Sequence, residues 1–360
     1  MVIRHAAWIA VATLLVALAV PGCGQTVVTS SGQSTPDVRF VDVDEGVRLE
    51  VIDWGGGSEG SSGGSSGRAV VLLAGSGNTA HVFDELAPKL RDCCHVYAIT
   101  RRGYGASSHP ASGYDDQRLA DDLLAALEQL HIEAPVLVGH SMGGGELTTL
   151  GSQHSDRLGG LVYLDGLADP RDATYTDSGF MALLEGLPAA MRTPPALDYS
   201  SVGAYRAAQQ RESGFAFPEP ELREGFAVNP DGTMGRYKAS TDAINRAIGA
   251  GQTKRNYTRI RVPVLAISTF TCTSDRGGTD ACIEHPGDTP KYAPASREEA
   301  EAITKYEAAQ DVYFDRWKKN VRSAAAPVRL VDVPRGAHHI FLSHEADVLR
   351  EMKAFVARLR

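Results

Sequence analysis

Four short runs of almost unbroken apolar residues, separated by helical patterns, constrain the fold of this chain more than any other feature. They are Ala69–Ala74, His95–Thr100, Pro135–Val138 and Leu161–Leu164. Strands of this kind are typical of parallel sheets, because both of their faces are buried. Helical spacing of leucines between two of the runs, at Arg118–Leu130, indicates a crossover helix. The sequence therefore predicts a mostly parallel sheet with helices on both faces.

The alternation of strands and helices is interrupted once. Residues 167–259 contain helical patches and scattered large apolar residues but no clear buried strand. Alternation then resumes, with strands expected at Val262–Ser268 and Val328–Val333 and helices at Ser296–Arg322 and Ala346–Leu359. A hairpin, Val38–Val43 with Val47–Trp54, is expected before the first buried strand, and Val82–Leu90 is expected to be a short helix. We therefore expect one core, residues 38–166 and 260–360, interrupted by a helical cap at 167–259.

The first 37 residues have the pattern of an export signal and a tether. Arg4 and His5 precede the apolar run Ala6–Val20, which ends in Pro21-Gly22-Cys23. A basic start, a short apolar run and small residues are typical of a secretory signal peptide over residues 1–23. The same residues resemble a lipoprotein signal, in which Cys23 would be lipidated and would anchor the protein to a membrane; simple secretion is the alternative. Residues 24–37, rich in Ser and Thr, are expected to form a flexible tether.

Charge and cysteine content narrow the possible partners. The 360-residue chain has a formal net charge of −8, with no basic stripe of the kind that nucleic acid requires. Cys272 and Cys282 flank a short polar segment and suit a local disulfide, whereas the adjacent Cys93 and Cys94 are interpreted as structural thiols. No cysteine spacing resembles a zinc site, and we expect neither a metal nor a cofactor.

The strongest chemical signal is Gly139-His140-Ser141-Met142-Gly143, between an expected strand and an expected helix. A serine at such a junction lies in a sharp, strained turn that exposes its hydroxyl, and glycines are needed where side chains would collide with the neighbouring backbone. The start of the following helix supplies free N–H groups for a developing oxyanion. Ser141 is therefore predicted to be a nucleophile.

With these features the chain resembles the α/β-hydrolase superfamily, within its group of lidded serine esterases and related hydrolases. The resemblance rests on the nucleophile turn, on the segment from Leu73 to Asn78, on Arg101-Arg102-Gly103-Tyr104-Gly105 and on Gly336-Ala337-His338-His339. It implies an eight-stranded, mostly parallel sheet with a cap inserted after the sixth strand. It also implies an oxyanion hole formed by the backbone N–H groups of Ser76 and Met142.

The general base and the acid follow from the same resemblance. The family's Gly-x-x-His pattern selects His339 as the base, with His338 as its competing neighbour. The chain order Ser, acid, His admits two acids: Asp165, at the end of the strand Leu161–Leu164, and Asp275, inside the segment between Cys272 and Cys282. Asp165 is preferred, because a carboxylate at the end of a central strand is well placed to be buried and to orient the imidazole.

These features predict a serine hydrolase that cleaves a carboxylic ester or a related acyl bond of a small molecule through an acyl-enzyme. A carboxylate in place of Ser141 would have indicated a dehalogenase or an epoxide hydrolase. Perhydrolysis, lactone hydrolysis and carbon–carbon bond hydrolysis use the same triad and stay open. A non-catalytic ligand-binding protein on the same fold is the alternative from a different class.

Overall fold

The computed structural model describes residues 35–56, 67–172, 178–193, 197–270, 279–283, 285, 293–334 and 336–359. Residues 1–34 lie outside these ranges, and with them the predicted signal segment and Cys23. Within the described part of the chain, no helix has both the length and the apolar character needed to cross a membrane. β1 begins at Asp37, the last residue of the predicted tether.

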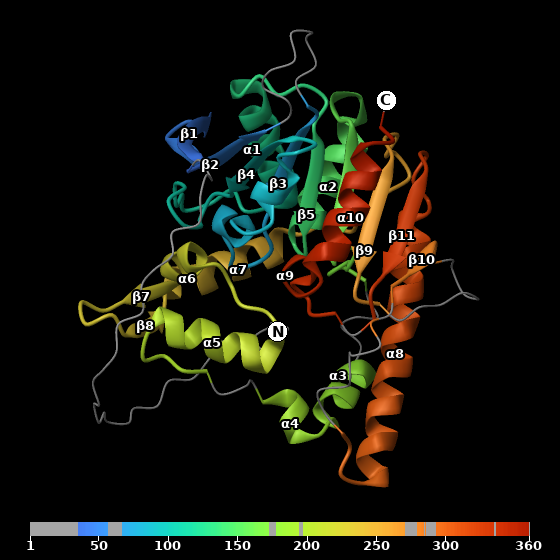
Figure 1. Cartoon of the computed structure of the whole chain (residues 1–360). Helices are drawn as coiled ribbons and strands as arrows, with labels where there is room; N and C mark the ends of the chain where they lie inside the picture. Colours follow the sequence, from blue (N-terminus) through green and yellow to red (C-terminus); the bar gives the residue numbers. More distant parts are fainter. Residues whose placement is uncertain are drawn as a thin grey trace.

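A single large sheet forms the centre of the molecule (Figure 1). Its strand order is β1-β2-β4-β3-β5-β6-β9-β11-β10. β2 pairs antiparallel with both of its neighbours, and every other pair is parallel. The strands are β1 (Asp37–Asp44), β2 (Val47–Gly56), β3 (Ala69–Leu73), β4 (His95–Thr100), β5 (Val136–His140), β6 (Gly160–Leu164), β9 (Val264–Ser268), β10 (Ala281–Cys282) and β11 (Val328–Asp332).

Two expectations about these elements are corrected. The described sheet has nine strands rather than eight, because the two-residue β10 pairs with the edge of β11. The segment expected to be a short helix at 82–90 forms two 3-10 turns, η1 (Ala80–Phe83) and η2 (Ala87–Leu90). Pro88 in the first turn of η2 lacks the backbone N–H that one continuous helix would need there.

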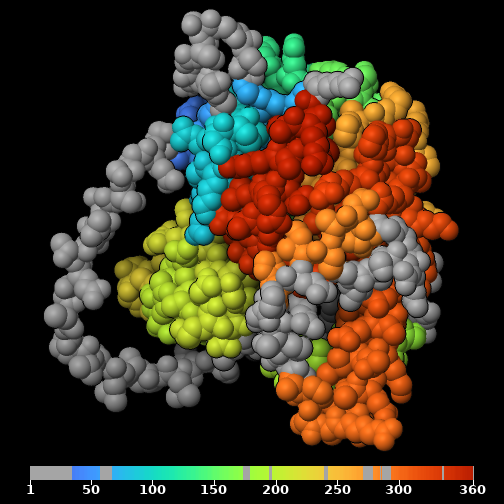
Figure 2. All heavy atoms as spheres, turned by 45° about the vertical axis from the view of Figure 1, so that its right-hand side comes forward, coloured from blue at the N-terminus to red at the C-terminus, as the bar shows by residue number. Residues whose placement is uncertain are grey.

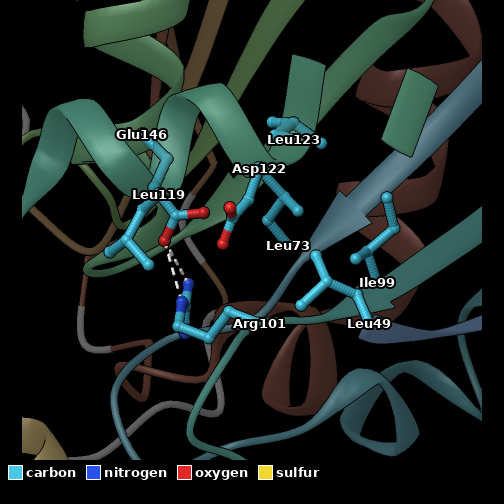
Figure 3. A pocket seen from close by; sticks show the side chains of 8 residues that line it. All are labelled: Leu49, Leu73, Ile99, Arg101, Leu119, Asp122, Leu123 and Glu146. Atoms are coloured by element: carbon cyan, nitrogen blue, oxygen red, sulfur yellow. Dashed lines mark hydrogen bonds and ion pairs between the residues drawn. The ribbon is translucent and has the colours of Figure 1, made fainter. Parts of the chain in front are cut away.

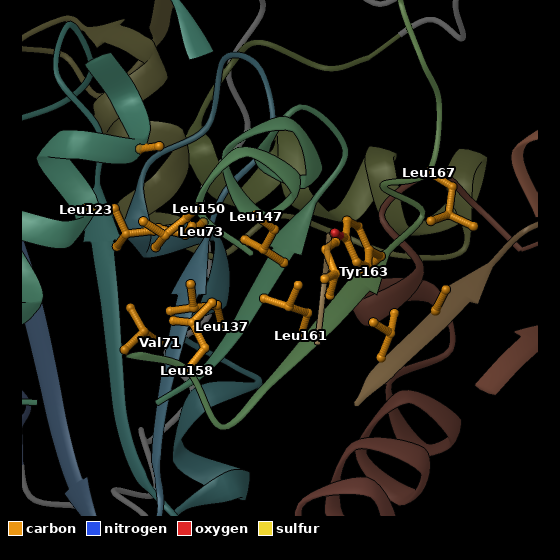
Figure 4. Close-up of a cluster of buried hydrophobic side chains, with 14 of the residues drawn as sticks. Val71, Leu73, Leu123, Leu137, Leu147, Leu150, Leu158, Leu161, Tyr163 and Leu167 are labelled. Carbon is orange, nitrogen blue, oxygen red and sulfur yellow. The ribbon is translucent and has the colours of Figure 1, made fainter. Parts of the chain in front are cut away.

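Alternation along the strands produces two separate cores. Val71, Leu137 and Leu161 point to one face, where they meet leucines of α1 and α2 (Figure 4). Their sequence neighbours Val136 and Val162 point to the other face, which η1, η2 and α10 cover. The helices are α1 (Asp116–Gln129) and α2 (Gly143–Gln153), with α8 (Arg297–Val321) on the same face, and α9 (Ile340–Ser343) with α10 (Glu345–Val356) on the opposite face.

The insertion lies between β6 and β9, after the sixth strand, as expected. It holds a small antiparallel hairpin in addition to helices, so it is not purely helical. Its elements are α3 (Ser178–Glu185), α4 (Ala189–Arg192), α5 (Val202–Ser213), α6 (Glu219–Gly225), β7 (Phe226–Val228), β8 (Met234–Tyr237) and α7 (Ala239–Gly251). α3 packs against the core helix α8, whereas α6 packs against η1. Figure 2 shows α5, in yellow-green, below and to the left of the red segment that contains α9 and α10.

Candidate active site

The turn after β5 holds Ser141 in a strained conformation. Ser141 has a φ of +51°, a left-handed value that costs a non-glycine residue about 1–3 kcal/mol. The surrounding backbone is very close: a Cβ on Gly139 would lie 2.8 Å from the carbonyl carbon of Gly143. The N–H of Ser141 donates to the carbonyl of Leu164 at 3.1 Å, which joins the turn to the end of β6. The predicted strand–turn–helix setting is therefore present.

His338, not His339, lies beside Ser141. The Oγ of Ser141 lies 2.8 Å from Nε2 of His338, and Nδ1 of the same ring lies 2.6 Å from Oδ2 of Asp165. The prediction that His339 occupies this position is wrong. His339 is already the N-cap residue of α9, and its ring turns toward the cap, whereas His338, one residue earlier in the loop, faces the ends of β5 and β6. The Gly-x-x-His pattern therefore pointed one residue too far.

Asp165 is oriented by the core around it. It too has a left-handed φ, of +45°, and its N–H donates to the carbonyl of Ile267 at 2.8 Å. Its Oδ1 accepts from the N–H and hydroxyl of Thr269, at 3.1 and 3.2 Å, which leaves Oδ2 for His338. The structure therefore brings Asp165 into line with Ser141 and His338. Asp275, the other candidate acid, lies outside the described residues.

The charges of this pair support one another. Burial alone would lower the pKa of His338, but its hydrogen bond and attraction to Asp165 raise that pKa above the usual value. Burial is the largest influence on Asp165 and would raise its pKa, but the hydrogen bond and attraction to His338, together with the backbone N–H of Thr269, lower that pKa overall. The carboxylate is only 9% exposed and the imidazole side chain 53% exposed. The His338 ring therefore joins a buried anion to a side that is open to solvent.

The two other histidines at the site are neutral supports. Burial, followed by the nearby His338, lowers the pKa of His339 to about 3. Its ring packs edge-on against Phe217, and its Nε2 lies 3.1 Å from Oδ1 of Asn78. Burial also lowers the pKa of His140 well below its usual value. Nε2 of His140 donates to the carbonyl of His338 at 2.9 Å and so anchors the loop that carries it, a contact that the sequence pattern did not indicate.

A loop of residues 75–79, here called the 75–79 loop, borders Ser141 on the side of β3. A Cβ on Gly75 would lie 3.0 Å from Cβ of Ser141 and 2.7 Å from Nδ1 of His140, so only glycine fits there without displacement. Within the described residues, the backbone N–H groups of Ser76 and Met142, the predicted oxyanion donors, make no hydrogen bond to a protein acceptor. Met142 is the N-cap residue of α2.

The structure describes three of the five cysteines. Cys93 and Cys94 are free thiols. Cys282, in β10, is disulfide-bonded, and its predicted partner Cys272 lies outside the described residues.

Residues 70–351 match the model of the alpha/beta hydrolase family. The chain belongs to this family. Over 146 residues it is 36% identical to epoxide hydrolase A of Mycobacterium tuberculosis. This match covers 38% of this chain and 40% of that protein. Over 151 residues it is 31% identical to a non-heme chloroperoxidase of Kitasatospora aureofaciens, a match that covers 40% of this chain and 51% of that protein. Over 100 residues it is 30% identical to 2-(acetamidomethylene)succinate hydrolase of Mesorhizobium japonicum, a match that covers 28% of this chain and 36% of that protein. The matches thus span about half or less of these relatives.

Solved structures agree with the fold of this alpha/beta hydrolase. The crystal structure of E-2-(acetamidomethylene)succinate hydrolase superposes with a TM-score of 0.55 at 20% identity, over 89% of this chain and 99% of that one. Est816, described as an N-acyl homoserine lactone degrading enzyme, superposes with a TM-score of 0.51 at 19% identity, over 88% and 100%. At such identities the likeness concerns the fold alone.

Proposed function

We propose that this alpha/beta hydrolase is a serine hydrolase that cleaves a carboxylic ester or a related acyl bond through an acyl-enzyme. The observation that carries the proposal is the continuous array from Ser141 Oγ through the imidazole of His338 to the carboxylate of Asp165, at 2.8 and 2.6 Å. Both distances lie within the range expected of a nucleophile, its base and the group that orients the base. The partner that the array requires is a small molecule with an electrophilic carbonyl.

Each side chain has a defined task in this mechanism. Oγ of Ser141 attacks the substrate carbonyl while Nε2 of His338 accepts its proton. Asp165 holds the Nδ1–H tautomer and stabilises the imidazolium that forms. The protonated ring then gives its proton to the leaving alcohol, and in the second half-reaction the neutral ring activates a water that releases the acid. The N–H groups of Ser76 and Met142 are the proposed donors to the oxyanion.

The hydroxyl nucleophile separates this chain from two activities named among its relatives. One relative is named epoxide hydrolase A, and another, from a Burkholderia species, fluoroacetate dehalogenase. A serine that opened an epoxide or displaced a halide would form an alkyl ether, which has no carbonyl for water to attack. Attack on an acyl carbon instead gives an ester that the same base can hydrolyse. The chemistry of Ser141 therefore favours acyl substrates.

Labelling with a fluorophosphonate probe tests the proposal directly. Wild type is expected to be labelled and to hydrolyse 4-nitrophenyl acetate, and Ser141→Ala is expected to lose both while keeping its melting temperature within a few degrees. Ser152, a half-buried serine of α2 whose hydroxyl donates to the carbonyl of Thr149 at 2.9 Å, offers a matched control, since Ser152→Ala should change neither. A folded wild type that resists the probe would favour the non-catalytic alternative. If wild type is labelled, a panel of thioester, lactone and amide substrates would show which class of acyl bond it cleaves fastest.

A further inference from the structure

A buried carboxylate of the cap contacts the 75–79 loop. Glu221, on α6, is 4% exposed. Its Oε1 accepts from Nδ2 of Asn78 at 2.7 Å, and its Oε2 accepts from the hydroxyl of Thr79 at 2.6 Å. The backbone N–H of Thr79 is shared between the two oxygens, at 3.2 and 3.1 Å. Three donors of one short loop thus converge on one side chain of the insertion.

The contact continues to the histidine beside the proposed base. Because the amide nitrogen of Asn78 donates to Glu221, its Oδ1 is free to accept, and this assigns the Nε2–H tautomer to His339. Asn78 is thus held at both ends of its amide, by Glu221 of the cap and by His339 of the core. Burial raises the pKa of Glu221 to about 7, although the bonds from Thr79 and Asn78 lower it. Keeping the Glu221 carboxylate charged at this buried position therefore costs solvation free energy.

The core holds the same loop at its other end. Arg101 donates from Nη2 to the carbonyl of Ala74 at 2.6 Å and from Nη1 to that of Gly75 at 2.9 Å. Figure 3 shows its guanidinium paired with Glu146, and both residues line an apolar space of about 10 Å³. In a trans peptide the C=O and the N–H point in opposite directions. A Gly75 carbonyl directed at Arg101 therefore directs the N–H of Ser76 away from it.

We propose that Glu221 is a positioning residue for the oxyanion donor Ser76, so that the cap completes the geometry of the active site as well as covering it. The proposal rests on the proposed function. Arg101 sets the direction of the peptide at Gly75, and Glu221 holds the loop two to three residues downstream through Asn78 and Thr79. Between these two anchors lies Gly77, whose φ of +81° marks the flexible point of the turn. Without Glu221 the donor would lose one of its two constraints.

Other cap side chains do not supply the same constraint. The Tyr237 hydroxyl donates to the Gly77 carbonyl at 3.3 Å, which is longer than the bonds from Asn78 and Thr79 to Glu221. Asn245, on α7, bonds to Tyr104 rather than to the loop backbone. Glu221 alone among the described cap residues binds a backbone N–H of the loop. We therefore assign the downstream anchor to this residue.

The test compares Glu221→Ala with Glu221→Gln and with Glu85→Ala. Glu85→Ala removes the ion pair to Arg206, at 2.8 Å, and is a matched cap–core control that does not touch the loop. The full-length protein is measured for kcat and KM with 4-nitrophenyl acetate, and for inhibition by a trifluoromethyl alkyl ketone, which forms a hemiketal oxyanion on serine. Amide hydrogen exchange of residues 75–79 in the ligand-free protein is measured in parallel.

Glu221→Ala is expected to lower kcat about 10-fold, to weaken ketone inhibition by a similar factor and to change KM less than twofold, because only interactions made in the transition state are lost. Glu221→Gln should recover most of kcat, and Glu85→Ala should match wild type. Exchange of the loop should be faster in Glu221→Ala alone. Loss of melting temperature with unchanged kcat and unchanged exchange would overturn the proposal. Faster exchange without any Ser141-dependent turnover would instead reject the proposed hydrolysis and leave the anchoring role supported.

Discussion

The nucleophile turn and the 75–79 loop border the same site but are held in different ways. Ser141 and Asp165 follow central strands, and strand backbone fixes both through the carbonyls of Leu164 and Ile267. The 75–79 loop leaves the sheet and is held by side chains, from Arg101 of the core and Glu221 of the cap. Backbone support is rigid and local, whereas the side-chain support from the cap comes from Glu221, which lies 142 residues after Thr79 in the sequence. Substitutions at the turn should therefore abolish activity, whereas substitutions around the loop should lower it only in part.

Replacement of the base should show the largest effect. His338→Ala removes the only imidazole within hydrogen-bond distance of Ser141 Oγ among the described residues, and kcat should fall by about 10⁴-fold or more. The adjacent His339→Ala is the matched control. It removes a neutral donor to Asn78 and should cost roughly 10-fold, the scale of a small displacement. Equal losses in the two variants, measured as kcat with 4-nitrophenyl acetate, would contradict the assignment of His338 as the base.

Asp165→Asn should have the next largest effect and should change the pH profile as well. An amide at this position can no longer hold the required tautomer or stabilise imidazolium, so kcat should fall by up to about 10⁴-fold. Asp165 raises the pKa of His338, and the base works only when neutral. The acidic limb of kcat/KM should thus lie above the usual histidine pKa in wild type and move to lower pH in the variant. A limb that stays in place would indicate that another carboxylate, such as Asp275, serves His338.

Gly75→Ala tests how closely the two regions approach each other. The new Cβ would lie 2.7 Å from His140 Nδ1 and 3.0 Å from Ser141 Cβ, so the loop or the turn must shift. We expect a loss of stability of about 1–3 kcal/mol and a fall in kcat of roughly 100-fold. Gly249→Ala is the control, since nothing lies within 4 Å of its Cβ in α7, and it should gain up to about 1 kcal/mol. An undisturbed Gly75→Ala enzyme would show that the loop does not limit the nucleophile.

The difference between the two regions also explains what could be predicted from the sequence. The strands and the nucleophile turn depend on local patterns, so β3, β4 and β5 lie within two residues of their expected bounds. The choice between His338 and His339 depends on the path of a loop, which a one-residue spacing does not determine. Glu221 carried no signal at all, since a lone glutamate near a helix start usually faces solvent. Its burial arises only when the insertion packs on η1.

The pH dependence of stability tests the loop anchor without any change in activity. Burial raises the pKa of Glu221 to about 7, well above its ordinary value of 4.5. The folded state therefore binds more protons than the unfolded state between about pH 4.5 and 7. Stability from this group is complete below that window and falls as pH rises through it. Glu221→Gln has no carboxyl group to titrate, so its stability should not fall in this way. The free energy of unfolding of the variant minus that of wild type should therefore increase from pH 4.5 to 8, by no more than about 3 kcal/mol. Urea titrations of both proteins at several pH values measure the difference. Parallel pH profiles would mean that Glu221 titrates normally, and that the cap opens over the 75–79 loop often enough to hydrate its anchor.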